Sequence, residues 1–410
     1  MRNKVDLQTR SDEEENAATQ QDTEPSQRPV VAKAYKLTEH YFEFLVYFSV
    51  AAILGSTLRV YMARIFGSDC QAEQASDFLV PFSSRICVTN NGRTEQTGGA
   101  LFTDFPANFL GSFLMGMMNP LAGSSRPKLP WLHRDHPLQR DEVFYTSLTT
   151  GFCGCLTTFA SWNTQMVVML DGKYSQLGSQ VVPVLFGYFV GFMGASYGFQ
   201  FGRQCNLWMY NYRHKDDGEV SSNNDIPLQN EEGEQLQAVP SHPHKIPLVV
   251  AAVALLIAFI AGDAVSGIEF YRGMILLWIL SPLGALCRWK LSDLNKKKGV
   301  IKHAPDWIPW GTFSANFIAT ILSACIEGLY HRYFYGADPT LANEWVAALL
   351  FALKTGVAGS LSTVSTMVKE STLLAEANPD KAHGHLYSIL TCVTCCLMGL
   401  AVYSTTIRVN

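Results

Sequence analysis

One stretch of sequence decides the fold: Thr150-Gly151-Phe152-Cys153-Gly154-Cys155-Leu156-Thr157-Thr158-Phe159-Ala160-Ser161-Trp162, inside an apolar segment from about residue 143 to residue 170. Its glycines loosen a helix, and its hydroxyls need hydrogen-bond partners inside lipid. Non-helical backbone survives at membrane depth only where protein buries it or water reaches it. The stretch therefore predicts a broken membrane helix whose freed carbonyls and hydroxyls serve an ion or a pore. Close packing through small residues is the alternative.

The same arrangement recurs near the carboxyl end, as Thr355-Gly356-Val357-Ala358-Gly359-Ser360-Leu361-Ser362-Thr363-Val364-Ser365-Thr366-Met367. The spacing from the leading Thr-Gly through the second glycine to the paired hydroxyls is unchanged. Two further pairs of motifs flank it in matching order. Residues 55–59 match residues 284–288, and residues 105–109 match residues 313–317. Three paired motifs in one order indicate an internal duplication.

The composition is that of an integral membrane protein. Charged residues make up 16% of the 410 residues, against about 25% in a typical soluble domain. Residues 1–40 are polar and partly acidic, which predicts a disordered cytoplasmic tail. The lipid bilayer is the expected surrounding of the chain. No basic patch suggests a nucleic acid as partner.

Nine segments are apolar over the ~20 residues that a helix needs to cross a bilayer. We predict membrane helices at residues 41–66, 98–118, 143–170, 181–208, 246–263, 272–291, 308–330, 341–368 and 384–407. The first four make one repeat, residues 41–208, and the last four make a second, residues 272–407. A polar cytoplasmic linker, residues 209–245, and an unpaired connector helix lie between them.

An odd connector makes the second set of four helices enter the membrane from the opposite side. Basic short loops support this, because such loops stay in the cytoplasm. The loop after the second helix and the loop after the sixth are both rich in Lys and Arg. The predicted fold is therefore an all-α membrane protein of two inverted four-helix repeats, with a cytoplasmic amino terminus and an outer carboxyl terminus.

The two broken helices, the third and the eighth, are expected to cross at the centre. Carbonyls freed at the breaks then converge there, and a ring of carbonyls suits a hard, weakly coordinated cation such as sodium. Such an ion, permanently buried, is a structural cofactor. The carbonyls in question lie near Gly154, Thr157, Gly359 and Ser362.

No enzyme constellation is present: the sequence has no nucleophile elbow, phosphate loop or paired carboxylates. The helix centres lack Asp and Glu, and Asp104 and Glu327 lie toward helix ends or without a partner. Proton-coupled pumps depend on buried carboxylates, so a passive pathway for an anion is favoured. Cys70 and Cys87 share one polar loop and form a disulfide only if that loop faces outward.

An anion needs donors. Asn108 and Asn316 offer amide NH2 groups at mid-helix, and hydroxyls near the breaks add more, among them Thr158, Ser161, Thr363, Ser365 and Thr366. Phe159 and Trp162 share a helical face and present electropositive ring edges. The ordinary alternatives stay open: a membrane Asn often joins helices, and a Phe usually faces core or lipid. Arg59 and Arg288, matched in the two halves, either snorkel or hold the broken helices structurally.

These residues resemble the fluoride channels of the Fluc/CrcB type, specifically their eukaryotic single-chain form, the FEX fluoride exporters. The family signature G-x-x-T-T-F-S-T-F is similar to residues 154–162, and the G-x-x-x-R motif and the helix 2 asparagine occur in order and twice. The resemblance covers roughly residues 41–407 without the loops. It implies a membrane-potential-driven channel in the plasma membrane that exports fluoride, works as a single chain and is not an enzyme.

The resemblance also implies roles for residues. The sodium carbonyls fall on Gly154, Thr157, Gly359 and Ser362. The pore phenylalanines fall on Phe159 and Trp162, but on Val364 and Met367 in the second half. The polar track of helix 4 falls on Tyr387, Thr391 and Cys395, but on Val182, Phe186 and Val190 in the first half. The expected fluoride pathway therefore consists of nine residues: Asn108, Thr158, Phe159, Trp162, Asn316, Thr363, Ser365, Tyr387 and Thr391.

Because each half lacks one element of the lining, we expect one working pore and one vestigial pore. Two other functions remain as alternatives. A proton-coupled antiporter of small multidrug-resistance type would want a glutamate in the middle of its first helix, where the sequence has only Glu43 at the start. A non-transporting membrane scaffold would merely pack helices.

Overall fold

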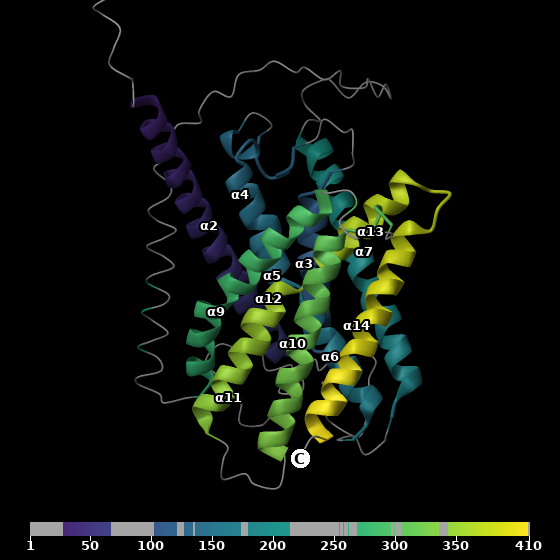
Figure 1. Cartoon of the computed structure of the whole chain (residues 1–410). Coiled ribbons are helices and arrows are strands. Elements are labelled where there is room, and N and C mark those ends of the chain that lie inside the picture. Colours follow the sequence, from purple (N-terminus) through teal and green to yellow (C-terminus); the bar gives the residue numbers. More distant parts are fainter. Residues whose placement is uncertain are drawn as a thin grey trace, which may run out of the picture. The chain divides into compact units, whose positions relative to one another are not determined.

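The computed structural model describes residues 28–66, 102–120, 127–133, 136–173, 179–213, 269–296, 305–335 and 343–408, with a few isolated positions between them. These residues form helices and turns, without a strand among them (Figure 1). Within this part of the chain, six helices are long and apolar enough to cross a membrane: Tyr41–Phe66, Val181–Arg213, Tyr271–Asn295, Trp310–Tyr333, Glu344–Ala377 and His383–Arg408. The chain is a multi-pass, all-helical protein.

Several predictions fall outside the described residues: the connector helix at 246–263, most of the linker at 209–245, and the pair Cys70 and Cys87. The chain divides into two units after Leu45, and the site described below lies within the second.

Helix α2 runs over Arg28–Phe66 and so begins inside the segment for which the sequence predicts a disordered tail. A helix that is already formed grows at little cost, because only nucleation is unfavourable. The sequence after Arg28 also contains good helix formers such as Ala32, Ala34 and Leu37.

Helix α3 covers Phe105–Met117 and is shorter than the predicted 98–118, since Phe102 to Asp104 form a turn ahead of it. It packs on α7, Val181–Arg213. Their contact is backbone against backbone: a Cβ atom at Gly116 would overlap the Phe199 carbonyl, and one at Gly202 would overlap that of Phe113. Small residues give membrane helices this close approach.

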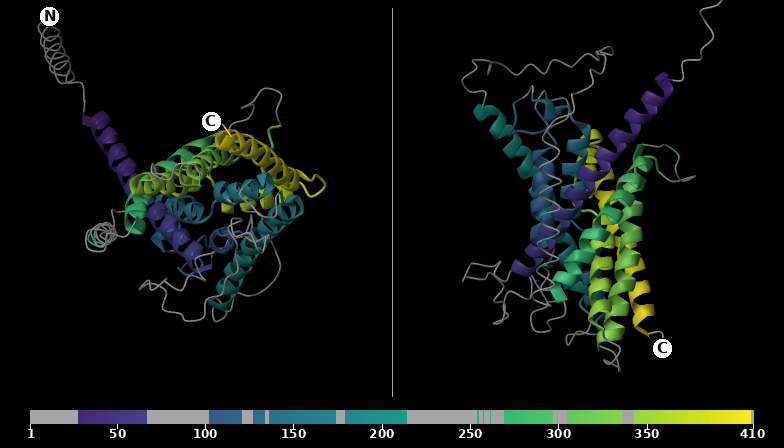
Figure 2. Two further views of the ribbon diagram at one scale, coloured as in Figure 1. Left: turned by 90° about the horizontal axis from the view of Figure 1, so that it is seen from below. Right: turned by 90° about the vertical axis from the view of Figure 1, so that its left-hand side faces the viewer.

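The second half repeats this arrangement with different helices. Helix α9 covers Glu269–Leu291 and is followed by the short η4, Ser292–Lys296. Helix α10, Trp310–Tyr335, packs along α14, His383–Arg408 (Figures 1 and 2). Thus α10 and α14 stand to each other as α3 and α7 do.

Two spans depart from regular helix at matching places. The first consists of α4 (Glu142–Thr146), the π-helical η3 (Ser147–Cys153), α5 (Gly154–Leu156) and α6 (Phe159–Asp171). The second consists of α11 (Glu344–Phe351), the π-helical η6 (Ala352–Ala358), α12 (Gly359–Leu361) and α13 (Ser365–Ala377). Thr157 has φ −93° and ψ 148°, and Ser362 has φ −83° and ψ 162°. Both are extended, so each span contains non-helical backbone between two helical parts.

Candidate functional site

The two asparagines hold the extended backbone of the breaks. Asn108 donates from Nδ2 to the Thr158 carbonyl at 3.1 Å and accepts from the Thr158 N–H at 2.8 Å. Asn316 makes the same pair of bonds to Thr363, at 3.2 Å and 2.8 Å. Backbone groups that leave a helix must find other partners, and here one amide satisfies both groups. The structure thus favours the joining role for these residues, and Asn316 Nδ2 also contacts the Met367 sulfur at 4.0 Å.

The breaks also cap each other's helices. The Ser362 hydroxyl accepts from the N–H groups of Phe159 and Ala160 at 3.2 and 3.0 Å, at the start of α6. Reciprocally, the Thr157 hydroxyl accepts from the N–H groups of Val364 and Ser365 at 3.3 and 3.2 Å, at the start of α13. A hydroxyl at this position satisfies N–H groups that a helix start leaves unpaired. Each span therefore depends on the other for a complete helix end.

Buried hydroxyls from both spans meet at this junction. The Thr157 hydroxyl lies 3.2 Å from that of Thr363 and 3.0 Å from that of Ser365, and the Thr158 hydroxyl lies 3.1 Å from that of Ser362. All five side chains are fully buried. We call these residues, Thr157, Thr158, Ser362, Thr363 and Ser365, the hydroxyl junction. The structure thus brings together three predicted pathway residues and two predicted metal ligands.

Two buried arginines cross from one half to the other. Arg59 on α2 donates to the carbonyls of Gly359 at 2.7 Å and Thr355 at 2.5 Å. Arg288 on α9 donates to Gly154 at 2.6 Å, to Ser362 at 2.9 Å and to Thr150. Both side chains are at most 3% exposed. The arginines do not snorkel to the membrane surface; they satisfy carbonyls that the irregular helices leave free.

These contacts test whether the four expected carbonyls suit a sodium ion. Gly154 and Ser362, one from each break, accept from the same nitrogen of Arg288, so their oxygens lie close together. A carbonyl oxygen has two lone pairs, which leaves one for a hard cation. Two neighbouring guanidinium charges make a monovalent ion far less costly than a divalent one. The described residues hold no cluster of three His, Cys, Asp or Glu that could bind a metal. Three of the four expected carbonyls, those of Gly154, Gly359 and Ser362, thus accept from an arginine and keep one lone pair each.

The predicted aromatic lining is fully buried. The ring centroids of Phe159 and Trp162 are 5.6 Å apart at an interplanar angle of 76°. Trp162 also stacks on Phe102 at 5.0 Å and 15°, and a Cβ atom at Gly191 of α7 would overlap its ring. Among the described residues, the Trp162 indole N–H has no acceptor. The tryptophan thus brings a buried donor that a phenylalanine would lack.

The polar track lies on the buried face of α14 and ends at a carboxylate that the sequence did not reveal. Tyr387 donates from its hydroxyl to Glu370 Oε2 at 3.0 Å. The other carboxylate oxygen accepts from Asn295 at 2.8 Å and from Thr312 at 2.7 Å. The Thr391 hydroxyl donates to the Tyr387 carbonyl at 2.8 Å. The predicted span ended at residue 368, whereas α13 continues to Ala377 and so includes Glu370.

In the first half, the expected counterparts of this track are in the wrong register. Val182 and Phe186 are 75% and 56% exposed. The buried face of α7 instead carries Gly187, Gly191 and Ala195. Nine residues separate α6 from α7 but only five separate α13 from α14, so the spacing from the break does not carry over from one half to the other. These three positions carry no polar side chain, whereas Arg203 and Asn206 are buried farther along α7.

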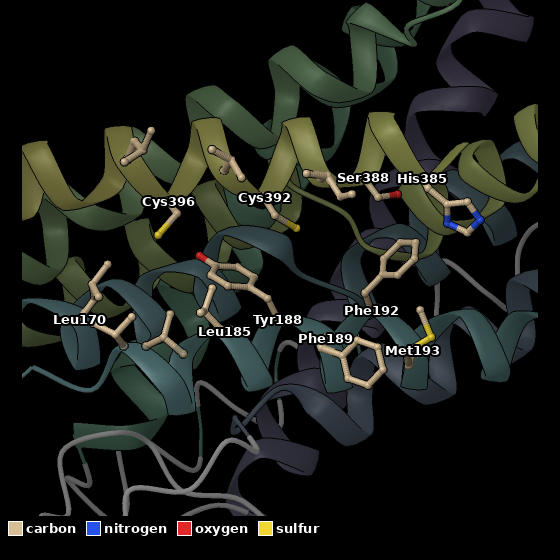
Figure 3. Close-up of a pocket in the computed structure, with 15 residues that line it drawn as sticks. Leu170, Leu185, Tyr188, Phe189, Phe192, Met193, His385, Ser388, Cys392 and Cys396 are labelled. Carbon is tan, nitrogen blue, oxygen red and sulfur yellow. The ribbon is translucent and has the colours of Figure 1, made fainter. Parts of the chain in front are cut away.

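An apolar cavity of about 480 Å³ lies between α7 and α14 (Figure 3). Leu185, Tyr188 and Phe189 line one side, and Cys392 and Cys396 line the other. It is separate from the hydroxyl junction, and no predicted pathway residue lines it. It carries no argument for ion conduction.

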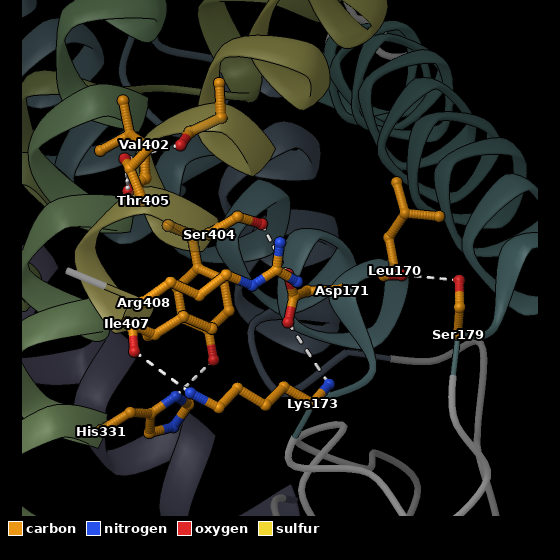
Figure 4. Close-up of polar contacts among 12 residues, drawn as sticks. Leu170, Asp171, Lys173, Ser179, His331, Val402, Ser404, Thr405, Ile407 and Arg408 are labelled. Atoms are coloured by element: carbon orange, nitrogen blue, oxygen red, sulfur yellow. Dashed lines mark hydrogen bonds and ion pairs between the residues drawn. The ribbon is translucent and has the colours of Figure 1, made fainter. Parts of the chain in front are cut away.

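A polar contact joins the end of α6 to the carboxyl end of α14 (Figure 4). Asp171 accepts from Ser404 at 2.5 Å and from Arg408 at 3.1 Å. Lys173 donates to the Ile407 carbonyl at 3.1 Å. These bonds fix the far end of the first broken span against the last helix of the second half.

Glu327 has a partner, contrary to the sequence-based expectation. Lys354 of η6 donates to its Oε2 at 2.5 Å, and His331 Nε2 lies 3.4 Å from its Oε1. The Glu327 side chain is 5% exposed and that of Lys354 23%. A buried carboxylate is tolerated where it is paired, and residues 27 positions apart gave no sequence signal of this pair.

The duplicated signature is that of a known family. The sequence model of the family described as CrcB-like protein, Camphor Resistance (CrcB), matches residues 46–199 and again residues 275–403. The chain belongs to the CrcB-like family. Both matches include a break, its asparagine and the arginine that reaches across to the other half.

Similar proteins are known in yeast and bacteria. Fluoride export protein 1 of Candida albicans is 27% identical over 296 residues, which cover 68% of this chain and 66% of that protein. The fluoride-specific ion channel FluC of Salinibacter ruber is 38% identical over 101 residues, or 24% of this chain and 65% of that protein. FluC 1 of Frankia casuarinae is 35% identical over 100 residues, or 24% and 72%. The chain thus covers just under two thirds of the first two relatives. No solved structure matches it.

Proposed function

We propose that this chain is a passive, selective fluoride channel that exports cytoplasmic fluoride. Its relatives are named as fluoride export proteins and fluoride-specific ion channels, and the family model matches both halves. The observation that carries the proposal is the hydroxyl junction, in which each half of the duplicated signature completes the other.

We infer nine membrane helices in two inverted repeats, with the connector helix at residues 246–263 between them. The reciprocal contacts support this arrangement: Arg59 reaches Gly359 as Arg288 reaches Gly154, and each break caps the other's helix. A pseudo-twofold axis produces such paired contacts, in which each half makes to the other the same bonds that it receives. The basic loops set the amino terminus in the cytoplasm and the carboxyl terminus outside. The plasma membrane is the membrane where export of the ion is useful.

The proposed pathway follows the aromatic and hydroxyl side chains that are buried together. Phe159, Val364, Met367 and Tyr387 belong to one buried cluster. Fluoride entering from the cytoplasm would meet the Tyr387 and Thr391 track, then Phe159 and Trp162, then Asn316 with Thr363 and Ser365. Asn108 and Thr158 make the matching contacts in the first half, where the polar track is missing. One working pore and one vestigial pore follow from this asymmetry.

No coupling ion is needed for export. Fluoride enters a cell as neutral HF from an acidic medium and ionises in the near-neutral cytoplasm. An inside-negative potential contributes about 2.3 kcal/mol per charge per 100 mV toward expelling the anion. Glu370 and Glu327 do not favour proton coupling, because both are paired to donors of the protein.

The experiment is fluoride efflux from proteoliposomes that contain the purified chain, measured with a fluoride electrode while a potassium gradient and valinomycin set the voltage. We expect efflux that follows the voltage and ignores an imposed pH gradient. Efflux driven by the pH gradient alone would indicate a coupled antiporter. If vesicles with the protein retain fluoride as well as empty vesicles do, the chain is not a channel, and the non-transporting scaffold is the remaining function.

We also propose a structural sodium ion held by the carbonyls of Gly154, Thr157, Gly359 and Ser362. The ion would link the two breaks where Arg288 already joins Gly154 to Ser362. A ligand that binds only the folded state raises thermal stability with its concentration. The midpoint of unfolding in detergent should therefore rise when sodium replaces N-methyl-D-glucamine. The same midpoint in both salts would exclude the ion.

A further inference from the structure

Beyond the junction, a row of buried polar side chains continues along one face of α10. Asn316 is followed by Thr320, Ser323, Glu327 and His331, at spacings of four, three, four and four residues. This spacing places them on one side of a helix. All five are at most 4% exposed. A polar row of this length inside a membrane protein needs partners or a purpose.

The row faces α6 and α14. Thr164 of α6 donates to the Ser323 hydroxyl at 2.9 Å. A Cβ atom at Gly399 of α14 would lie 3.0 Å from Asn163 Nδ2 and 3.2 Å from the Thr320 methyl group. Gly399 thus lets the three helices meet closely, and Asn163, Thr320 and the Gly399 backbone share one place.

Within the part of the chain that the structure describes, three donors at this place have a hydrogen without an acceptor. Among the described residues, the Thr320 hydroxyl has no hydrogen-bond partner of acceptable geometry, although it lies beside the Cys395 thiol. Ser323 accepts from Thr164, which leaves its own O–H to donate. Asn163 accepts from Tyr188 at 2.6 Å and uses one N–H on the Cys395 carbonyl at 3.3 Å, which leaves the second. A buried donor without an acceptor is costly.

We propose that Asn163, Thr320 and Ser323 form an additional binding position for a small monovalent anion, one to two turns beyond Asn316. The inference rests on the proposed function and extends its pathway toward Lys354. An anion accepts from all three donors at once, and bonds to a charged partner are the strong ones. The site selects a small anion because Gly399 and the packed helices leave little room. Lys354 of η6 places a partly exposed cation against Glu327, near the end of the row.

The matching place in the first half provides the control. Ser112 stands where Thr320 does, is fully buried, and its hydroxyl also has no partner among the described residues. The positions that match Ser323, Asn163 and Gly399 are Met115, Val368 and Phe199, all buried and apolar. A single hydroxyl among apolar groups cannot replace the hydration of an anion.

The test measures fluoride efflux from proteoliposomes with the full chain and four variants: Thr320→Val, Thr320→Ser, Ser323→Ala and Ser112→Ala. We expect Thr320→Val and Ser323→Ala each to lower efflux about tenfold, as loss of a bond to a charged group predicts. Thr320→Ser, which keeps the hydroxyl, should retain much more flux than Thr320→Val. Ser112→Ala should conduct like the parent chain.

A second readout separates binding from folding. The fluoride concentration that gives half-maximal flux should rise in Thr320→Val, while the unfolding midpoint stays close to that of Thr320→Ser. Equal flux and equal half-saturation in the parent, Thr320→Val and Ser323→Ala would overturn the site. A parent chain that does not conduct fluoride would instead overturn the proposed function, so the two failures are distinct.

Discussion

In the first half, the break at Thr157 leads into Phe159 and Trp162, whereas in the second the break at Ser362 leads into Val364 and Met367. The contacts that hold the two breaks are nevertheless the same. Each has an asparagine that binds the extended backbone, an arginine from the other half, and a hydroxyl that caps the opposite helix. The halves share the contacts that hold the backbone and differ in the side chains that line it.

The polar side chains of the lining show the reverse difference: the second half has them and the first half lacks them. In the second half, Tyr387 on the buried face of α14 is bonded to Glu370 of the neighbouring helix α13. In the first half, Gln165 stands in the place of Glu370 and accepts from the Thr103 N–H at 3.1 Å, while glycines occupy the buried face of α7. The hydroxyl at each break caps a helix of the other half, so its loss from one half would leave the N–H groups of the other half's helix unpaired. Lining side chains carry no such constraint.

The largest expected effect is a difference in fluoride efflux between variants of Asn316 and Asn108. Asn316→Asp should lower fluoride efflux about a hundredfold or more, because an intramembrane carboxylate costs on the order of 3 kcal/mol and repels the anion. Asn108→Asp damages an identical pair of backbone bonds and should lose much less flux in the same electrode assay. Equal losses in both variants would mean that the pores are equivalent.

The aromatic lining gives the next comparison. Phe159→Ile should abolish most efflux, since it removes the ring edge in the only half that has one. Met367→Leu conserves volume in a buried position and should leave flux near that of the parent chain. Retention of flux in Phe159→Ile would remove this ring from the pathway.

The arginines should differ in stability. A lysine cannot reproduce the fork of an arginine, so each Arg→Lys variant leaves buried carbonyls unpaired, at a cost of about 1.5–3 kcal/mol for each lost bond to the charge. Arg288→Lys should lower the unfolding midpoint in detergent more than Arg59→Lys, because Arg288 binds three carbonyls and Arg59 two. The reverse order would show that these bonds do not set the stability.

The smallest effect should be a loss of stability that is equal for the two breaks. Ser362→Ala and Thr157→Val each remove a hydroxyl cap from the opposite helix, at a cost of about 1 kcal/mol. Their unfolding midpoints should fall by similar amounts, since each cap accepts from two N–H groups. A clear difference would mean that one break is held by contacts that the other lacks.

Much of the site could be read from residue types alone. Small and hydroxyl residues inside an apolar segment indicate irregular backbone, and their recurrence at residue 355 indicates a partner for it. The sequence did not reveal Glu370, because the apolar stretch ends at residue 368 while the helix goes on. It also misplaced the buried face of α7, since loop length sets the register of a helix and composition does not.

The sequence by itself determined that the chain is helical, crosses the membrane several times and carries one motif twice. These are local properties, fixed by apolar segments long enough to span lipid and by residues that interrupt a helix. Only the tertiary structure decided which groups satisfy the interrupted backbone. Arg288 reaches Gly154 and Ser362 reaches Ala160 across long separations in sequence, and such pairings arise from packing, which no local pattern encodes.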